Sequence, residues 1–263
     1  MNYKVLLAVT VTAVIMTSCP GRKNSKWQPA KNTLFTEWGE SIDPSAPWNE
    51  YPRPGLVREE WMSLNGLWDY AICRKDESRP SPEGKILVPY PVESALSGVK
   101  RRMTDSLALW YSRSFKLPMD WKGKQITLNF EASDWETTVW IDDNFAVSHR
   151  GGYDPFSCNI TPYLSDGRNH SIVVRVTDPT DKGRQPRGKQ VSDPEGIWYT
   201  PSTGIWQSVW LEPTGPSWIG DLRIIPDVDN STLTVRVNEE RCQGPDGCPP
   251  VDMAPSLAEV TVS

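Results

Sequence analysis

The chain has 263 residues, room for one large all-β domain or for an ordinary domain and part of another. Its formal net charge is −5, and its charged residues are interspersed, which excludes the basic face that nucleic-acid binding requires. The 24 prolines and 18 glycines interrupt the chain at short intervals, and 13 tryptophans dominate the aromatic residues. This composition favours many short strands over helices.

The first 19 residues have the pattern of an export signal. One lysine precedes an apolar run from Val5 to Met16, which is too short to span a membrane. The small residues before Cys19 resemble the lipobox of bacterial lipoproteins, although Met16 stands where that motif prefers leucine. A plain secretory signal with an incidental Cys19 is the alternative. We expect an exported protein in the periplasm or outer membrane of a Gram-negative bacterium, with a lipid on Cys19 as its only membrane contact.

Residues 20–50 are polar and proline-rich, and are predicted to form a tether and an extended lead-in. From Leu64 onward, short alternating runs are separated by glycine- and proline-containing breaks, as in strands joined by turns. In the first run, Trp68 and Tyr70 share one face. The runs are LNGLWDYAIC, KILVPY, LALWYSRSFKL, KQITLNFEA, TTVWID, NFAVSH, SIVVRVTD and IWQSVWLEP. Such a series predicts an antiparallel β-sandwich of the jelly-roll type over residues 51–214.

A second unit is expected after the Pro-Thr-Gly-Pro break that follows. Hydrophobic residues alternate on both sides of an Asp-Val-Asp-Asn turn, which predicts a hairpin, and the final AEVTVS alternates again. Two or three strands cannot bury a core on their own. We therefore expect residues 215–263 to be part of a larger domain, or the chain to be a fragment.

Four cysteines remain after Cys19. Cys242 and Cys248 bracket a Gly-Pro-Asp-Gly turn, so a local disulfide between them is plausible in an exported protein. Cys73 and Cys158 lie in apolar runs, where two buried thiols fit at least as well as a bond. No cysteine or histidine spacing predicts a zinc site. We predict no cofactor, with a structural calcium as one alternative.

Two polar groups have structural and functional alternatives. The only histidines are His149 and His170, which leaves little material for a histidine-based triad. His149 precedes a double-glycine turn and is expected to be a structural hydrogen-bonding residue. Asp142, Asp143 and Asn144 are expected to cap a hairpin or, as the alternative, to help coordinate a structural calcium.

The segment GIWYTPSTGIWQSVWLEP, residues 196–213, concentrates aromatic residues around a turn. If residues 205–212 form one strand, Trp206 and Trp210 share a face, and both are expected in the sandwich because aromatic side chains are strongly buried. Trp198 and Tyr199 precede the turn in a proline-bounded loop. They are the candidate binding surface, since aromatic rings stack on the C–H faces of sugars.

The motifs LNGLWDYA, VPYPVESALSGV, LWYSRSFKLP, LNFEASDWETTVWIDD, HRGGYDPFSCNITPYL, IVVRVTD and GIWYTPSTGIWQSVWLEP follow one another in order. This series resembles the N-terminal sugar-binding jelly roll of glycoside hydrolase family 2, which includes β-galactosidases, β-glucuronidases and β-mannosidases. The resemblance implies a galactose-binding-domain-like sandwich. It also implies that the chain from residue 216 begins an immunoglobulin-like sandwich.

In this family both catalytic glutamates lie on a later (β/α)₈ barrel, and the pair hydrolyses glycosides with retention. We therefore assign no catalytic residue in this chain. A metal associated with that downstream barrel is the other alternative to our prediction of no cofactor. The family's Asn-Glu dipeptide occurs at Asn49-Glu50 and Asn238-Glu239, where we expect solvated surface. In well-known members an acidic residue six positions before the glycine of the Gly-Ile turn helps to bind substrate. Here that position is Trp198, which fits either stacking on a sugar or packing on the sandwich.

There are two weaker substrate-binding candidates, of which the first comes from the same resemblance. Glu93 lies in a loop that could face the barrel, and its alternative is an ion pair with Arg101 or Arg102. Trp135 lies between two acidic residues in a polar-aromatic tip, which is equally typical of a hairpin bend.

The leading hypothesis is the N-terminal portion of an exported retaining β-glycosidase, acting on β-linked glycans together with its own downstream barrel. In this reading the present residues form the non-catalytic sugar-binding and support domain. The alternative is a stand-alone, non-catalytic carbohydrate-binding lipoprotein.

Overall fold

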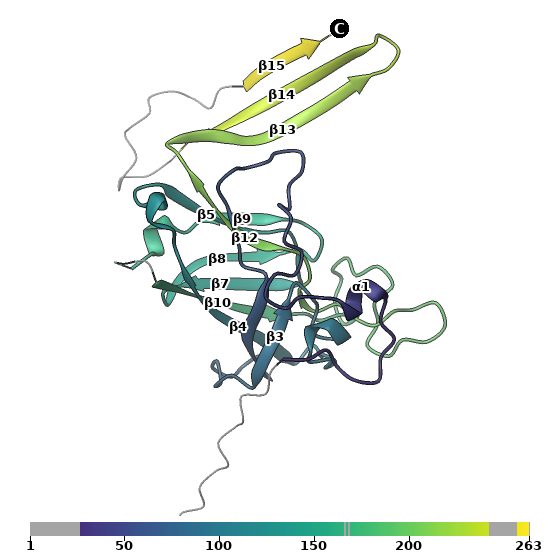
Figure 1. The fold of residues 1–263 in the computed structure, drawn as a ribbon. Coiled ribbons are helices and arrows are strands. Elements are labelled where there is room, and N and C mark those ends of the chain that lie inside the picture. Colours follow the sequence, from purple (N-terminus) through teal and green to yellow (C-terminus); the bar gives the residue numbers. More distant parts are fainter. Residues whose placement is uncertain (1–26, 166, 168, 242–256, 263) are drawn as a thin grey trace, which may run out of the picture.

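The structure of the protein is a computed structural model that describes residues 27–165, 167, 169–241 and 257–262. Two antiparallel sheets face each other in a β-sandwich (Figure 1). The six-stranded sheet has the order β3 (Gly84–Val88), β2 (Gly66–Arg74), β4 (Leu107–Lys116), β10 (Asn169–Thr177), β7 (Glu136–Ile141) and β8 (Asn144–Arg150). The four-stranded sheet has the order β1 (Met62–Ser63), β12 (Val209–Thr214), β5 (Gln125–Phe130) and β9 (Phe156–Asn159). The predicted all-β sandwich is confirmed.

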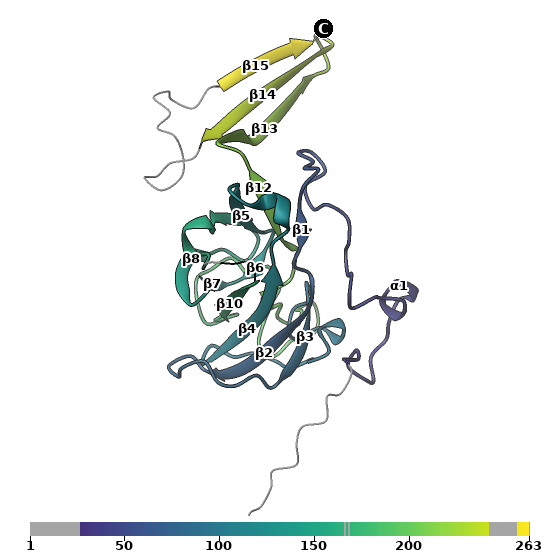
Figure 2. The same cartoon turned by 60° about the vertical axis from the view of Figure 1, so that its left-hand side comes forward.

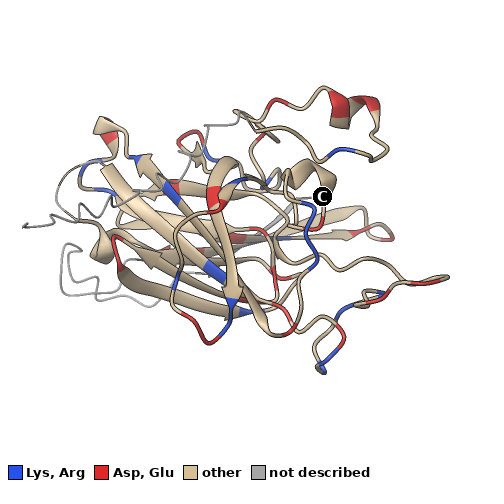
Figure 3. Cartoon of the chain, turned by 90° about the horizontal axis from the view of Figure 1, so that it is seen from below, with Lys and Arg blue, Asp and Glu red and all other residues tan. Residues whose placement is uncertain are grey.

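A short ribbon and short helical elements accompany the two sheets. A two-stranded ribbon pairs β6 (Ser133–Asp134) with β11 (Gly204–Ile205). The helical elements are short: α1 (Glu37–Glu40), η1 (Ala95–Ser97), η2 (Met119–Trp121) and η3 (Thr161–Tyr163). Across the residues that the structure describes, no helix has the length and apolar character needed to cross a membrane. Acidic and basic residues are interspersed along the ribbon (Figure 3).

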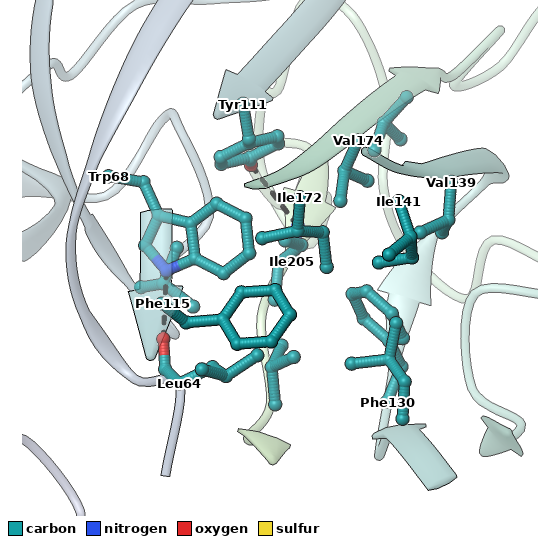
Figure 4. Packing of buried hydrophobic residues seen from close by; sticks show 14 of the residues in the cluster. Leu64, Trp68, Tyr111, Phe115, Phe130, Val139, Ile141, Ile172, Val174 and Ile205 are labelled. Atoms are coloured by element: carbon teal, nitrogen blue, oxygen red, sulfur yellow. Dashed lines mark hydrogen bonds between the residues drawn. The ribbon is translucent and has the colours of Figure 1, made fainter. Parts of the chain in front are cut away.

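The core follows from the alternation of the strands. Leu109 and Tyr111 point inward from β4, and Ile172 does so from the neighbouring β10. Figure 4 shows the ring of Tyr111 beside that of Trp68, with centroids 6.3 Å apart in an edge-to-face arrangement. Each fully buried side chain of this size contributes roughly 1.5–3 kcal/mol to stability. Trp68 lies in this core, and Tyr70, predicted on the same face, is half-buried and packs against it.

The LNGLW motif joins the two sheets at one corner. Gly66 has φ +117°, which favours glycine, and it opens β2. The buried Asn65 accepts a hydrogen bond from the backbone N–H of Val209 at 3.0 Å and donates to Ser208 Oγ at 3.1 Å. The indole N–H of Trp68 donates to the carbonyl of Leu64 at 2.8 Å. The motif thus supplies hydrogen-bond partners to the N–H of Val209 and the hydroxyl of Ser208, which lie at the start of β12 and far away in sequence.

The strand expected over residues 205–212 is interrupted, and that prediction is wrong. Ile205 pairs with Ser133 in the small ribbon, whereas Val209 pairs with Phe130 in the four-stranded sheet. The intervening residues 206–208 form no strand, because the chain crosses from one sheet to the other. As expected, Trp210 is buried in the sandwich, whereas Trp206 is only half-buried.

The chain before β1 is fastened to the sandwich by a buried carboxylate. Glu212 on β12 is 2% exposed. It accepts hydrogen bonds from Tyr51 Oη at 2.6 Å and from the Arg53 guanidinium at 2.6 Å and 2.7 Å. Arg58 lies 3.5 Å from the same carboxylate. Ionised partners and good geometry are what permit a carboxylate at this depth.

The chain after the sandwich forms a three-stranded antiparallel sheet of β13 (Ser217–Asp227), β14 (Thr232–Arg241) and β15 (Leu257–Val262). Figures 1 and 2 both show this sheet projecting away from the sandwich. The predicted hairpin is confirmed by the pairing of Ile224 with Val235. Hydrophobic side chains of this sheet remain exposed, Ile224 among them. The division into domains at residues 214 and 215 stays a prediction.

The predicted polar and cysteine features have mixed outcomes. Asp142 lies in the turn between β7 and β8, but both of its carboxylate oxygens accept hydrogen bonds from outside that hairpin, from Ser165, Ser171 and His170 Nδ1. Burial acts against these bonds, which nevertheless hold the pKa of Asp142 well below its usual range. Within the turn, Asn144 Nδ2 donates to the Asp142 carbonyl at 2.9 Å. The expected hydrogen-bonding role of His149 is not seen at Nε2, which has no partner in the described chain; its ring stacks on Phe156.

Two cysteine predictions can be compared with the structure and two cannot. Cys73 and Cys158 are free thiols, and burial raises the pKa of Cys158 to about 12. Cys19, Cys242 and Cys248 lie outside the described residues, so the predicted lipidation and disulfide stay predictions.

Candidate functional site

The candidate site is the loop of residues 178–203, which connects β10 to β11 and leaves the sandwich at the right of Figure 1. Its two arms are joined near the tip. The N–H of Val191 donates to the Tyr199 carbonyl at 3.1 Å, and the N–H of Tyr199 donates to the Lys189 carbonyl at 2.8 Å. At the tip Trp198 is 43% and Tyr199 63% exposed. The backbone is therefore fixed where the two aromatic rings reach solvent.

The loop is held at its C-terminal end by a buried carboxyl group. Glu93 is 9% exposed, and its Oε2 accepts a hydrogen bond from the N–H of Thr203 at 2.9 Å. Thr203 Oγ1 donates in turn to Asp178 Oδ2 at 3.0 Å, and the N–H of Thr180 donates to Asp178 Oδ1 at 2.6 Å. Asp178 thus ties the first residues of the loop to its last ones.

A second carboxyl group holds the middle of the loop. Gln190 Nε2 lies 3.3 Å from Asp134 Oδ2 and 3.2 Å from Tyr153 Oη. Gln190 Oε1 accepts from the N–H of Ser202 at 2.6 Å, which closes the loop on itself. A Cβ on Gly152 would lie 2.5 Å from Asp134 Oδ1, so only glycine fits beside this carboxyl group.

The base of the loop is unusual because its three carboxyl groups lack cations. Among the described residues, no ion pair involves Glu93, Asp134 or Asp178, and no group of acidic, histidine or cysteine side chains is arranged to hold a metal. Burial raises the pKa of Glu93 to about 7. Burial and then the charge of Asp178 raise the pKa of Asp134 to about 7, and burial also raises the pKa of Asp178. Near pH 7 Glu93 and Asp134 are therefore each partly protonated.

The predicted binding residues occupy different levels of this site. Trp198 and Tyr199 are exposed at the tip, whereas Trp135 is half-buried and follows Asp134 at the base. Glu93 is more deeply buried than these three aromatic residues. The binding roles of all four stay predictions.

The alternative offered for Glu93, an ion pair with Arg101 or Arg102, is wrong. Arg101 pairs with Glu83 at 3.0 Å, and Arg102 lies 4.0 Å from Asp193. Glu93 is too deeply buried to meet these surface guanidinium groups and accepts from the loop backbone instead.

Sequence reasoning missed Asp178, Gln190 and Thr203. Asp178 directly follows an apolar strand, and a carboxylate at a strand end was an available signal. Gln190 and Thr203 carried no such signal, because their partners depend on how the loop folds back.

The two Asn-Glu dipeptides lie away from this loop. Glu50 is exposed, as expected, on the segment before β1. Glu239 is half-buried on β14, where it pairs with Arg241 at 2.9 Å. The expectation of solvated surface therefore holds for Glu50 and only partly for Glu239.

Comparison with known proteins agrees with this architecture. The model of the "Glycosyl hydrolases family 2, sugar binding domain" matches residues 83–214. A β-glucuronidase of Paenibacillus borealis is 24% identical over 216 residues, which are 75% of this chain and 36% of that protein. A β-galactosidase of Thermoanaerobacter pseudethanolicus is 30% identical over 119 residues, which are 45% of this chain and 15% of that protein.

A solved structure shows the same fold. The β-glucuronidase of Faecalibacterium prausnitzii matches with a TM-score of 0.56 at 23% identity, covering 81% of this chain and 42% of that one. The chain thus spans less than half the length of each of these three relatives. The family match covers the loop and the sandwich from β3 to β12, and the chain therefore belongs to glycosyl hydrolase family 2, with its sugar-binding domain matched at residues 83–214.

Proposed function

We propose that this chain is the N-terminal portion of an exported β-glycosidase that hydrolyses O-glycosidic bonds in glycans with retention. The loop of residues 178–203 contributes Trp198 and Tyr199 to the substrate-binding surface. The observation that carries this proposal is the loop itself, in which exposed aromatic rings stand on a backbone fixed by buried hydrogen bonds. The match to the family's sugar-binding domain and the β-galactosidase and β-glucuronidase relatives support it.

The chemistry of the tip suits a sugar. An aromatic face presents a flat apolar surface to the C–H groups of a pyranose, and the polar edge of the sugar stays solvated. Lys189 Nζ lies 5.9 Å from the centre of the Tyr199 ring, which adds a positive charge beside that surface. By the family resemblance, Trp198 stands where other members place an acidic residue, so stacking replaces a hydroxyl acceptor in this chain.

In this proposal the described residues bind and orient the substrate, and hydrolysis requires further groups. Retaining hydrolysis uses two carboxyl groups, an acid/base and a nucleophile, about 5–5.5 Å apart on either side of the scissile bond. In the proposal a downstream barrel supplies both, and the sandwich supports that barrel at the loop. The whole enzyme acts outside the cytoplasm, anchored by a lipid on Cys19.

The proposal is tested on the protein encoded by the whole gene, incubated with 4-nitrophenyl β-galactoside, β-glucoside, β-glucuronide and β-mannoside. We expect release from at least one substrate, with the first-formed sugar in the β configuration by proton NMR. No release from any of the four by folded protein would contradict the glycosidase assignment, and an initial α product would contradict retention.

The anchor needs a separate measurement. Intact mass of the mature protein from membranes should show an acylated cysteine at its N-terminus. A mature N-terminus elsewhere, without lipid, would contradict the anchor and leave the glycosidase proposal standing.

A further inference from the structure

The outer face of the six-stranded sheet carries a second concave site. A cleft of about 300 Å³ lies over β2 and β4, between Trp110 on one side and the segment of residues 79–82 on the other. Ala71 and Ser112 lie between these walls. The cleft includes no residue of the loop of residues 178–203, so it is a separate site. Its volume is at the lower end for small-molecule sites, roughly 300–1,000 Å³, which suits one sugar ring.

The aromatic wall of the cleft is held in place. Trp110 stacks on Trp140 with ring centroids 5.6 Å apart and an interplanar angle of 24°. The guanidinium of Arg175 lies 5.7 Å from the Trp110 ring centre and donates to the Lys75 carbonyl at 2.8 Å. A wall fixed from several directions loses little entropy when a ligand binds.

This wall also contains an unused hydrogen-bond donor. The indole Nε1 of Trp110 is shielded from solvent and has no acceptor in the described part of the chain. A buried donor without a partner costs about 1–3 kcal/mol. Because Nε1 is shielded, a ligand in the cleft meets the ring of Trp110 and not this donor.

The charges around the cleft are not balanced. Asp69 is neutralised by Lys85, whose Nζ lies 2.9 Å from Oδ1. Arg79 lines the cleft, is exposed, and pairs with no acid of the described residues. The cleft therefore offers one free guanidinium, and a guanidinium binds a carboxylate better than a neutral hydroxyl.

We propose that this cleft is an accessory binding site for a carboxylate-bearing pyranose, a uronic acid unit of a glycan. The sugar ring lies against Trp110 and the prolines at positions 80 and 82, and its carboxylate pairs with Arg79. The inference does not depend on the proposed hydrolysis, because it uses neither the loop nor a catalytic group.

The test is titration of the full chain with methyl β-D-glucuronide, with methyl β-D-glucoside as the uncharged probe, followed by NMR shifts or calorimetry. We expect the uronide to bind with a Kd on the order of 1 mM, since a single ring makes few contacts. The glucoside should bind about tenfold more weakly, because it lacks the charged hydrogen-bond acceptor.

Two arginine variants separate the site from general charge effects. Arg79→Gln should weaken uronide binding about tenfold, whereas Arg74→Gln, an exposed arginine of the same turn that pairs with Asp76, should not. Absence of uronide binding, equal binding of both sugars, or an unchanged affinity in Arg79→Gln would overturn the proposal. Loss of uronide binding on Tyr199→Ala would place the sugar in the loop and would also overturn it.

Discussion

Replacing Glu93 by glutamine should change how the stability of the chain depends on pH. Burial raises the pKa of Glu93 from 4.5 to about 7. Between those two values the unfolded chain has released this proton and the folded chain has kept it. The free energy of unfolding therefore falls as pH rises through this range, and its contribution is fully present only below the unfolded pKa.

The size of the effect follows from the shift. One pKa unit corresponds to about 1.4 kcal/mol, so Glu93 should account for about 3 kcal/mol of lost stability between pH 5 and pH 8. Asp134 acts in the same direction, because burial also raises its pKa to about 7. In Glu93→Gln the Asp134 contribution remains and the Glu93 contribution disappears.

Urea unfolding of the full chain and of Glu93→Gln at pH 5 and pH 8 measures this difference. The glutamine carbonyl can still accept a hydrogen bond from the Thr203 N–H. The new amide NH₂ takes the place of Glu93 Oε1, which is buried without a hydrogen-bond partner in the described residues, and this adds a cost at both pH values. The comparison therefore uses the change between the two pH values. Glu50→Gln, at an exposed site, is the control. An equal pH dependence in the parent and in Glu93→Gln would show that Glu93 does not keep its proton in the folded chain.

Three further substitutions test the packing of the sandwich, each by urea unfolding of the full chain. Gly204→Ala should cost about 3 kcal/mol or more, because φ is +94° and the new Cβ would overlap the hydroxyl of Tyr111; a cost below 1 kcal/mol would contradict this. Arg53→Ala should cost about 2 kcal/mol by leaving the buried Glu212 with weaker partners, and no change would show that the pair adds nothing. Asn65→Ala should cost about 1–3 kcal/mol of unfolding free energy through lost hydrogen bonds across the sandwich. A native-like circular dichroism spectrum checks that this variant still folds.

The parts of the fold that the sequence predicted are those fixed by local alternation. The run beginning at Leu64 forms β2, and Trp68 points into the core, because period-two hydrophobicity and an Asn-Gly turn are local signals. The interruption at residues 206–208 had no such signal. It arises because Ile205 and Val209 pair with different sheets. The pairing depends on how distant strands assemble and not on the local sequence.

The site divides in the same way. The exposed pair Trp198 and Tyr199 could be proposed from a proline-bounded aromatic loop. The environment of Glu93 could not, since its partner Thr203 lies 110 residues away in sequence. A carboxyl group next to arginines in sequence suggests an ion pair, and only the folded chain shows that burial excludes it.

The central claim is that the tip of the loop of residues 178–203 contacts substrate in a β-glycosidase. Its most direct test is kcat/KM of the protein encoded by the whole gene, compared with Tyr199→Ala and with Phe145→Ala, an exposed aromatic residue on β8. We expect Tyr199→Ala to lower kcat/KM on a glycan substrate about tenfold, through the loss of one stacking contact, and Phe145→Ala to leave it unchanged. Equal activity of Tyr199→Ala and the parent would contradict the claim.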